Sequence, residues 1–167
     1  MSTDRFNTFL AASGYGDGPI SFLAGDCSNR KYYRLGRDRT PSVLLMDAPP
    51  PEESLEDFIK VAHLLKSMGL SVPNIIDVDL TQGLALIEDF GDATYSRLLK
   101  EGGDDETYYT LATKTLIHLQ KHFNKADHKD LNGFSFEIFM REINVMIEWY
   151  YPRAFDGPMS EAAKEEF

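Results

Sequence analysis

The chain has 167 residues, and its 27 acidic and 17 basic side chains give a formal net charge of −10. Hydrophobic residues make up 43% and charged residues 26%, which is typical of a folded domain and excludes collagen-like and disordered classes. The acidic balance argues against a large nucleic-acid-binding surface. The single cysteine, Cys27, cannot form an internal disulfide, and no apolar run approaches the roughly 20 residues of a membrane-spanning helix. We therefore expect a cytoplasmic protein with no nucleic-acid or membrane partner.

Short strand patterns dominate the first half of the chain. A helix is predicted over residues 3–13, where Phe6 and Leu10 recur at helical spacing. The first two strand patterns enclose a polar turn and predict a hairpin. A capping box that begins at Ser54 predicts a second helix, which ends at Gly69. Five strands are expected, at Ile20–Gly25, Lys31–Leu35, Val43–Asp47, Ile75–Asp79 and Leu84–Glu88.

The pattern changes after Gly91, because every later segment has helical spacing. Helices are predicted over residues 94–100, 105–125 and 136–151, and another begins near Met159. Five strands with one inserted helix, followed only by helices, indicate an α+β protein with two lobes. We place these lobes at residues 1–92 and 93–167.

Three segments, taken together in their order and spacing, resemble a known family. They are the turn and second strand GDCSNRKYYRL (25–35), the third strand and its proline exit LLMDAPPP (44–51), and the fifth strand with its continuation GLALIEDFGDATY (83–95). Together they resemble the aminoglycoside phosphotransferase-like kinases, most closely the bacterial N-acetylmuramate/N-acetylglucosamine anomeric sugar kinases. The resemblance implies a protein-kinase-like small lobe, a five-stranded antiparallel sheet with one inserted helix, followed by helices of a truncated large lobe.

The resemblance also implies a nucleotide site with two ends. The polar turn offers backbone N–H groups and side-chain donors to phosphate oxygens, and its cations add positive charge. At the other end, the segment Glu88–Gly91, here called the hinge segment, would present backbone groups to the edge of adenine. An ordinary hairpin turn and a plain strand-to-helix loop are the alternative interpretations. The candidate nucleotide-binding residues are Gly25, Asp26, Ser28, Asn29, Arg30, Lys31, Arg34, Glu88 and Phe90.

Two features depart from the kinase pattern. Protein kinases hold the α- and β-phosphates with a lysine on the third strand, and Met46 occupies that place here. Phosphate would then have to be neutralised by a cation of the preceding hairpin: Arg30, Lys31 or Arg34. The acids at the start of the next helix, Glu52, Glu53 and Glu56, are interpreted only as charges favoured at a helix N-terminus. The triplet at 89–91 spells a kinase magnesium motif, but no catalytic loop precedes it, so we treat this match as chance.

The groups that perform phosphoryl transfer do not occur in their expected pattern. The reaction needs a carboxylate near the acceptor hydroxyl and carboxylates that bind magnesium. His128-Lys129-Asp130 and Phe155-Asp156-Gly157 match the two motifs only in part, and we assign neither a role. We expect no catalytic residue and no metal ligand in this chain, with the Mg²⁺ ligands in a missing C-terminal part. His118 and His122 have the spacing of a metal pair but are interpreted as a solvated helix face.

These expectations describe an ATP-dependent phosphotransferase that acts on a small-molecule hydroxyl, of the kind that recycles cell-wall amino sugars, present here as an N-terminal fragment. Its partners would be a nucleotide with Mg²⁺ and a sugar-like acceptor. Because a nucleotide has to touch both ends of its site, the turn and the hinge segment must lie within its reach. The alternatives are a pseudokinase-like nucleotide-binding domain, an acidic interaction module that binds no nucleotide, and a complete divergent kinase that uses Asp130 and Asp156.

Overall fold

The structure, a computed structural model, describes residues 2–25, 28–36, 42–127, 129, 131 and 133–166. It divides into two compact units, Met1–Phe123 and Asn124–Phe167. The lobe boundary that we place at residue 92 lies inside the first unit and stays a prediction. Within the described ranges, no helix is both long enough and apolar enough to cross a membrane.

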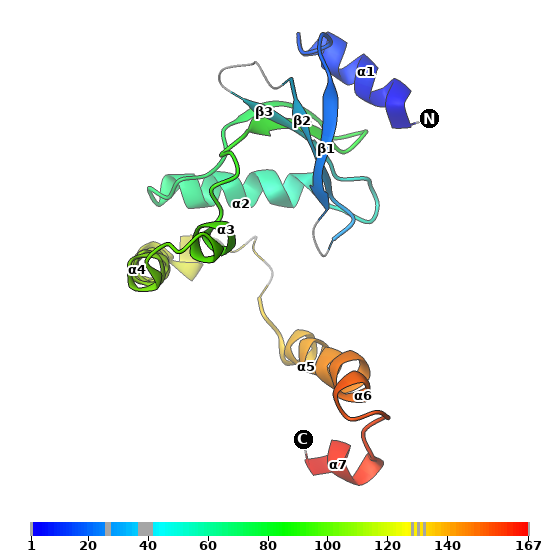
Figure 1. Cartoon of the computed structure of the whole chain (residues 1–167), viewed down its shortest axis with the longest axis vertical. Helices are drawn as coiled ribbons and strands as arrows, with labels where there is room; N and C mark the ends of the chain where they lie inside the picture. The colour runs from blue at the N-terminus through cyan, green and yellow to red at the C-terminus, as the bar shows by residue number, and fades with distance from the viewer. Residues whose placement is uncertain are drawn as a thin grey trace. The chain divides into compact units, whose positions relative to one another are not determined.

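Five antiparallel strands form one sheet in the first unit, in the order β1-β2-β3-β5-β4 (Figure 1). This confirms the predicted α+β class with a kinase-like sheet. The almost continuously apolar strands β3 and β5 lie at the centre, where both faces of a strand are covered. The strands have the predicted bounds: β1 (Ile20–Gly25), β2 (Lys31–Leu35), β3 (Val43–Asp47), β4 (Ile75–Asp79) and β5 (Leu84–Glu88).

Helix α1 (Ser2–Ala12) covers one face of the sheet. Its apolar stripe packs on inward-facing residues of β2, β3 and β5, and Tyr33 adds an edge-on ring contact to Phe6, with ring centroids 5.1 Å apart. Strand alternation explains the selection, because every second residue of a strand points to the same face. The buried cluster consists of Phe6, Phe9, Leu10, Leu35, Val43, Leu45, Leu84 and Leu86.

An ion pair also fixes α1 to the sheet. Arg5 of α1 contacts the buried carboxylate of Asp47, the last residue of β3. The same guanidinium donates from Nη1 to the carbonyl oxygen of Gln82 at 2.7 Å. Burial, and then the negative charge of Asp47, raise the pKa of the neighbouring Tyr33 phenol. The first helix is therefore a part of the folded unit and not an appendage.

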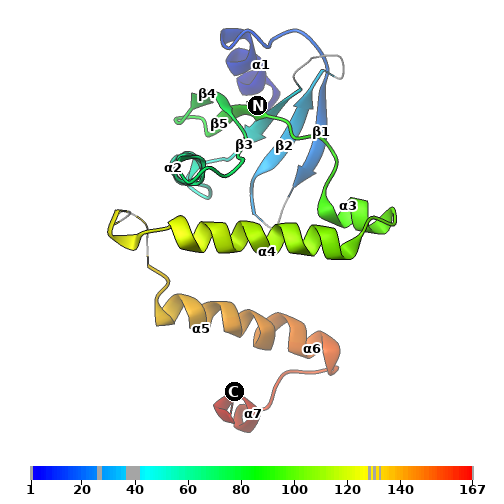
Figure 2. The same cartoon turned by 90° about the vertical axis from the view of Figure 1, so that its left-hand side faces the viewer.

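Helix α2 (Leu55–Ser67) covers the opposite face (Figure 2). The predicted cap is confirmed, since Ser54 Oγ accepts a hydrogen bond from the backbone N–H of Asp57 at 3.1 Å. The helix ends just before Gly69, whose φ of +79° is a left-handed conformation that favours glycine. The buried cluster between α2 and the sheet consists of Met46, Ala48, Leu55, Ala85 and Ile87.

Two further helices complete the first unit, α3 (Tyr95–Lys100) and α4 (Asp105–His122). Their caps are Thr94 and Asp104, whose side chains accept hydrogen bonds from backbone N–H groups of the first turn. On α4, His118 Nε2 lies 2.7 Å from the carbonyl oxygen of Met68, at the end of α2. This hydrogen bond joins the long helix to the sheet-covering helix.

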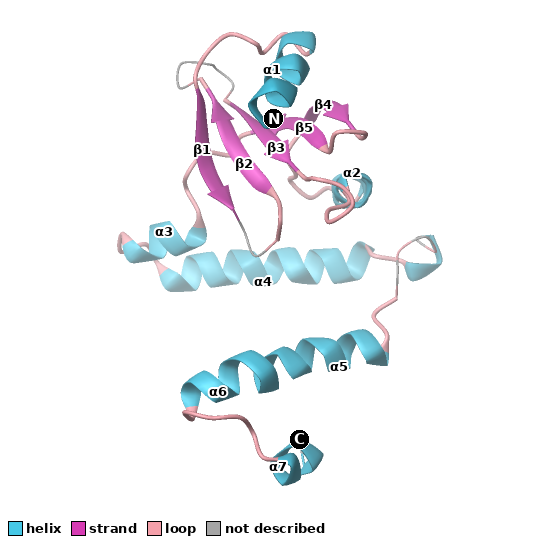
Figure 3. Cartoon of the chain, turned by 90° about the vertical axis from the view of Figure 1, so that its right-hand side faces the viewer, coloured by secondary structure: helices cyan, strands magenta, loops and turns pink. Residues whose placement is uncertain are grey.

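The second unit contains helices joined by loops (Figure 3). The predicted helix over 136–151 is only partly correct, because the π-helical turn η2 (Met146–Tyr150) interrupts it. Pro152 follows within two residues, and it cannot donate a helical hydrogen bond, so the regular α-helix is broken there. The remaining elements are η1 (Lys125–Asp127), α5 (Phe136–Val145), α6 (Tyr151–Ala154) and α7 (Glu161–Glu166).

Candidate functional site

The turn and the hinge segment lie at opposite ends of the sheet. Strand register shows this, because Lys31 pairs with Asp47 and so lies level with Leu84, whereas Leu35 pairs with Val43 and lies level with Glu88. Four residues of an antiparallel strand span about 14 Å, and two strand spacings add about 10 Å sideways. An extended nucleoside triphosphate can cover such a span.

A cavity of about 540 Å³ adjoins the hinge segment. Its walls come from β1, from β2 and from the segment that follows β5. The polar and charged groups around it belong to Ser21, Arg34, Ser42, Asp89 and Asp92. It therefore combines an exposed strand edge with a set of hydrogen-bonding side chains.

Arg34 organises this cavity by pairing with two carboxylates. Its Nε and Nη2 donate to the two oxygens of Asp89 at 2.5 and 3.0 Å, and its Nη1 and Nη2 donate to the two oxygens of Asp92 at 3.1 and 2.9 Å. Asp89 accepts two more hydrogen bonds, from Ser42 Oγ at 2.7 Å and from the backbone N–H of Gly91 at 2.8 Å. This set of contacts, here called the hinge clamp, joins β2 directly to the hinge segment.

The hinge clamp shifts the pKa of each charged group in it. Burial raises the pKa of Asp89, but hydrogen bonds from Arg34, Ser42 and Gly91 outweigh this effect and leave the pKa below its ordinary value. The hydrogen bonds and charge of Arg34 lower the pKa of Asp92. The two carboxylates, Asp89 first, raise the pKa of Arg34 further above its ordinary value. All three groups are therefore charged at neutral pH.

The backbone of the hinge segment is partly engaged. The N–H of Glu88 donates to the carbonyl oxygen of Asn74 at 2.9 Å. The Glu88 carboxylate accepts from the backbone N–H and the side-chain amide of Asn74 at 3.0 and 2.6 Å. Phe90 is 57% exposed. The predicted contacts of Glu88 and Phe90 with adenine stay predictions, and the Glu88 carbonyl and Phe90 N–H are the groups that would make them.

The turn end of the site carries Ser28, Asn29 and Arg30. The backbone N–H and the Nε of Arg30 both donate to Ser28 Oγ at 3.2 Å. Glu53 approaches from the segment before α2, where its Oε1 accepts from the N–H of Asn29 at 2.8 Å. Its Oε2 lies 3.4 Å from Arg30 Nε. Gly25 is the last residue of β1, and Asp26 and Cys27 lie outside the described residues.

Sequence reasoning missed the role of Glu53. It treated this residue as an acid at a helix N-terminus, but Glu53 precedes the cap of α2 and its side chain pairs with the turn. The partners are more than twenty positions apart in the chain, so local patterning could not reveal the contact. A cation just before one strand and an acid just before the next helix cap is the signal that could have suggested it.

Strand alternation places two of the candidate cations, Lys31 and Arg34, on opposite sides of the sheet. Lys31 occupies the same side of β2 as Tyr33 and Leu35, which is the side that α1 covers. Arg34 lies on the other side, at the hinge end. Met46, where kinases have lysine, is fully buried between the sheet and α2. The predicted contacts of Lys31 and Arg34 with phosphate stay predictions.

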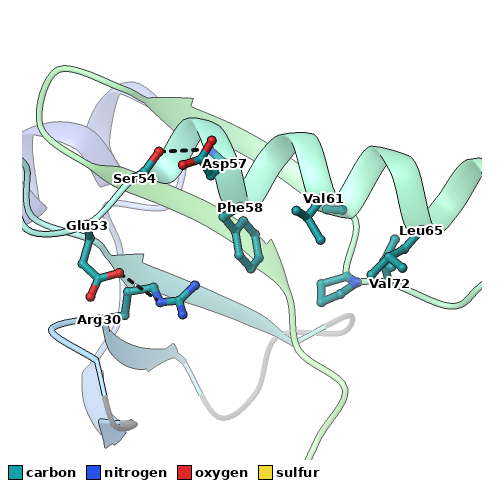
Figure 4. Close-up of a pocket in the computed structure, with 10 residues that line it drawn as sticks. Arg30, Glu53, Ser54, Asp57, Phe58, Val61, Leu65 and Val72 are labelled. Carbon is teal, nitrogen blue, oxygen red and sulfur yellow. Dashed lines mark hydrogen bonds and ion pairs between the residues drawn. The ribbon is translucent and has the colours of Figure 1, made fainter. Parts of the chain in front are cut away.

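A groove of about 440 Å³ runs along α2 from the turn end (Figure 4). Arg30 and Glu53 lie at its polar end, with Ser54 and Asp57 on the helix beside them. Farther along α2 the groove becomes apolar, with walls formed by Phe58, Val61, Ala62, Leu65, Val72 and Pro73. A charged end and an apolar wall are features of small-molecule sites.

The expectation that the two partial catalytic motifs have no role stays a prediction. In the first motif and the turn after it, His128, Asp130 and Asn132 lie outside the described residues. Asp156 is exposed and has a φ of 52° at the end of α6. The rings of His118 and His122 stack with centroids 4.0 Å apart, and their ring nitrogens contact the carbonyl oxygens of Met68 and His118.

Comparison with known proteins places this geometry in a family. The model of the phosphotransferase enzyme family matches residues 19–142, which include both ends of the site. The N-acetylmuramate/N-acetylglucosamine kinase of Pseudomonas aeruginosa is 37% identical over 149 residues, covering 86% of this chain and 42% of the relative. The protein of the same name from Pseudomonas putida is 29% identical over 164 residues, covering 96% and 47%.

The chain thus spans less than half the length of these curated relatives. A third kinase of this name, from Caulobacter vibrioides, is 32% identical over 136 residues. The resemblance that three segments of the sequence suggested is confirmed. Because the family model covers most of the chain and the relatives match it, the chain belongs to the phosphotransferase enzyme family.

Proposed function

We propose that this chain forms the nucleotide-binding part of an ATP-dependent kinase that phosphorylates an amino sugar. The observation that carries the proposal is the placement of a basic turn and a hinge cavity at the two ends of one sheet, inside the segment that matches the phosphotransferase family. The nucleotide would lie along the α2 side of the β1–β2 hairpin, with its base at the hinge segment and its phosphates at the turn.

The residues present fit a nucleotide. Backbone groups of Glu88 and Phe90 would bind the adenine edge. The turn residues Gly25, Asp26, Ser28 and Asn29 would surround the phosphate chain, with Arg30 and Lys31 as nearby cations. Arg34 would position the hinge segment, since its guanidinium binds Asp89 in that segment and Asp92 just after it. ATP supplies the transferred phosphoryl group, and the ligands of its Mg²⁺ would come from a C-terminal part of the whole protein.

The acceptor is proposed from the relatives. The three relatives compared above all carry the name N-acetylmuramate/N-acetylglucosamine kinase, which names two amino sugars. A sugar hydroxyl is a weak nucleophile, so the whole protein would need to position it in line with the γ-phosphate. The expected acceptor for the whole protein is therefore an N-acetylated amino sugar.

Nucleotide binding by this chain tests the first half of the proposal. Titration with Mg·ATP should produce a calorimetric signal and raise the melting temperature, because a ligand that binds only the native state stabilises by about 2.7 kcal/mol at a hundred times its Kd. Ser21→Trp, which fills the hinge cavity, should abolish this effect. Ser67→Trp, at an exposed position near the end of α2, should leave it intact. A wild-type chain that binds no nucleotide would support an acidic interaction module instead.

Phosphotransfer tests the second half. The protein extended by the rest of its reading frame should release ADP in the presence of N-acetylglucosamine or N-acetylmuramate, and much less with glucose. Turnover by the 167-residue chain that Asp130→Asn abolishes would instead support the complete divergent kinase.

A further inference from the structure

The third strand of this chain has no cation for phosphate, and the position that would hold one is closed. Met46 is fully buried, pairs with Tyr32 and Ala85 in the sheet register, and belongs to the apolar cluster beneath α2. A phosphate cannot reach this position without unpacking that cluster. If the chain binds a nucleotide, its phosphates must find positive charge elsewhere.

Resting on the proposed function, we propose that Arg30 binds the phosphate chain of the nucleotide and that Glu53 positions Arg30 for it. The pair would replace the lysine and the helix glutamate that protein kinases use for the same purpose. Here the cation comes from the turn residue just before β2 and the acid from the segment before α2, so both partners lie at the turn end of the sheet.

Arg30 is a better candidate phosphate ligand than Lys31 or Arg34, because of the side of the sheet on which it lies and the residues that it contacts. Lys31 lies on the α1 side of β2, away from the groove along α2. Arg34 lies at the hinge end, where it pairs with the almost fully buried carboxylate of Asp89 and with the exposed carboxylate of Asp92. These two carboxylates already neutralise its charge. Arg30 lines the groove itself and lies at its polar end (Figure 4).

The contacts of Arg30 fix the orientation of its guanidinium group, as phosphate binding would require. Its Nε donates to Ser28 Oγ and lies 3.4 Å from Glu53 Oε2, so one edge of the planar guanidinium is fixed. A guanidinium is planar, and its N–H donors form a fork that matches the geometry of phosphate oxygens. Fixing one edge in advance reduces the conformational entropy that is lost when an anion binds.

Glu53 also fixes the turn. Its side chain is 14% exposed, and besides Arg30 it binds the backbone N–H of Asn29. It therefore ties the turn to the start of α2, and removal of its charge should release Arg30 without removing the helix cap at Ser54. Glu53 is a positioning residue in this proposal, since it acts on phosphate only through Arg30.

The test compares Mg·ATP with adenosine, because adenosine shares the base and ribose but has no phosphate. In Arg30→Ala, ATP affinity should fall about 10- to 100-fold, the range for losing one or two hydrogen bonds to a charged group, and adenosine affinity should not change. Arg30→Lys should fall between wild type and Arg30→Ala. Glu53→Gln keeps an acceptor for the Asn29 N–H and removes the charge. This variant should lower the affinity for ATP about three- to tenfold and leave the affinity for adenosine unchanged.

Arg97→Ala is the matched control. Arg97 of α3 forms another arginine–glutamate pair, with Glu101 at the C-terminal cap of that helix, and both side chains are more than half exposed. This variant should bind ATP and adenosine as the wild type does. Far-UV circular dichroism and melting temperature establish that each variant is folded.

Each other result has a defined meaning. If wild type binds neither ligand, the proposed function fails. If wild type binds both, but Arg30→Ala keeps the same ratio of ATP to adenosine affinity, this inference fails and the proposed function stands. An effect confined to Lys31→Ala, or a gain of ATP affinity in Glu53→Gln, would also overturn the assignment.

Discussion

Arg34→Ala should destabilise the first unit strongly, because it removes the centre of the hinge clamp. The side chain of Asp89 is only 3% exposed, and that of Arg34 is 19% exposed. Removing one partner of a buried ion pair typically costs about 3–5 kcal/mol, since the other charge stays buried without compensation. Ser42 Oγ and the Gly91 N–H still donate to Asp89, so we expect the lower end of this range, about 3 kcal/mol.

The pair with Asp92 adds little to this figure. Its carboxylate is 52% exposed, and water and salt screen such pairs. Asp92→Asn should therefore change the free energy of unfolding much less than Asp89→Asn. This contrast tests whether the buried carboxylate, Asp89, contributes most of the stability of the hinge clamp.

Urea and thermal unfolding followed by far-UV circular dichroism measure the effect. The only tryptophan, Trp149, belongs to the second unit, so circular dichroism, to which the sheet and its helices contribute directly, is the chosen probe. For a unit of this size, a loss of about 3 kcal/mol lowers the melting temperature by about 10 °C. Arg97→Ala, which breaks an exposed arginine–glutamate pair, should cost less than about 0.5 kcal/mol. A loss below about 1 kcal/mol in Arg34→Ala would refute the reasoning.

The pH dependence provides a second check on the hinge clamp. The folded protein lowers the pKa of Asp89, so the native state binds fewer protons than the unfolded state over the pH range between the two values. The stabilisation is thus complete above the ordinary carboxyl pKa and is lost as pH falls through the lowered folded value. The free energy of unfolding of the wild type should decrease on acidification below about pH 4, and Asp89→Asn should decrease less. Parallel pH profiles would contradict this assignment.

Two further substitutions test how the sheet is held. Arg5→Ala removes the cation that pairs with buried Asp47 and should cost about 3 kcal/mol in urea unfolding, because that carboxylate keeps its burial and loses its partner. Gly83→Ala should prevent stable folding, since a methyl there would collide with the carbonyl oxygen of Ala48, whereas Gly69→Ala, also at positive φ but facing open space, should cost only about 1 kcal/mol.

The strands could be predicted because their ends carry strong local signals. Pro49 comes shortly after β3, a polar turn separates β1 from β2, and a glycine precedes Leu84 at the start of β5. Residues of these types disfavour continuation of a strand, so they mark where the strands end. The π-helical turn in the second unit was harder to predict from the sequence. The predicted period continues through Met146, and only the position of Pro152 indicates that regular hydrogen bonding fails there.

The site was predicted as a set of residues but not as a set of contacts. Local patterns along the chain predict the turn and the hinge segment, but charge pairs across the fold depend on which face each side chain occupies. Arg34 and Asp89 are 55 positions apart, and Arg30 lies in the turn before β2 whereas Glu53 lies in the segment before α2. Both pairs arise because β2 and its neighbours bring distant charges to the same side of the sheet, which composition and spacing do not specify.

The two arginines of the β2 hairpin should therefore act on a nucleotide in separable ways. Arg34 holds the hinge segment, so Arg34→Ala should lower the affinities for ATP and adenosine by similar factors. Arg30→Ala should lower only the affinity for ATP. The two side chains are four residues apart and share none of the partners described above, so their effects on ATP affinity should add within about 0.5 kcal/mol. The double variant, titrated with both ligands, measures this. Strong non-additivity, or loss of adenosine binding in Arg30→Ala, would mean that the turn and the hinge segment are coupled through β2 and do not form independent ends of one site.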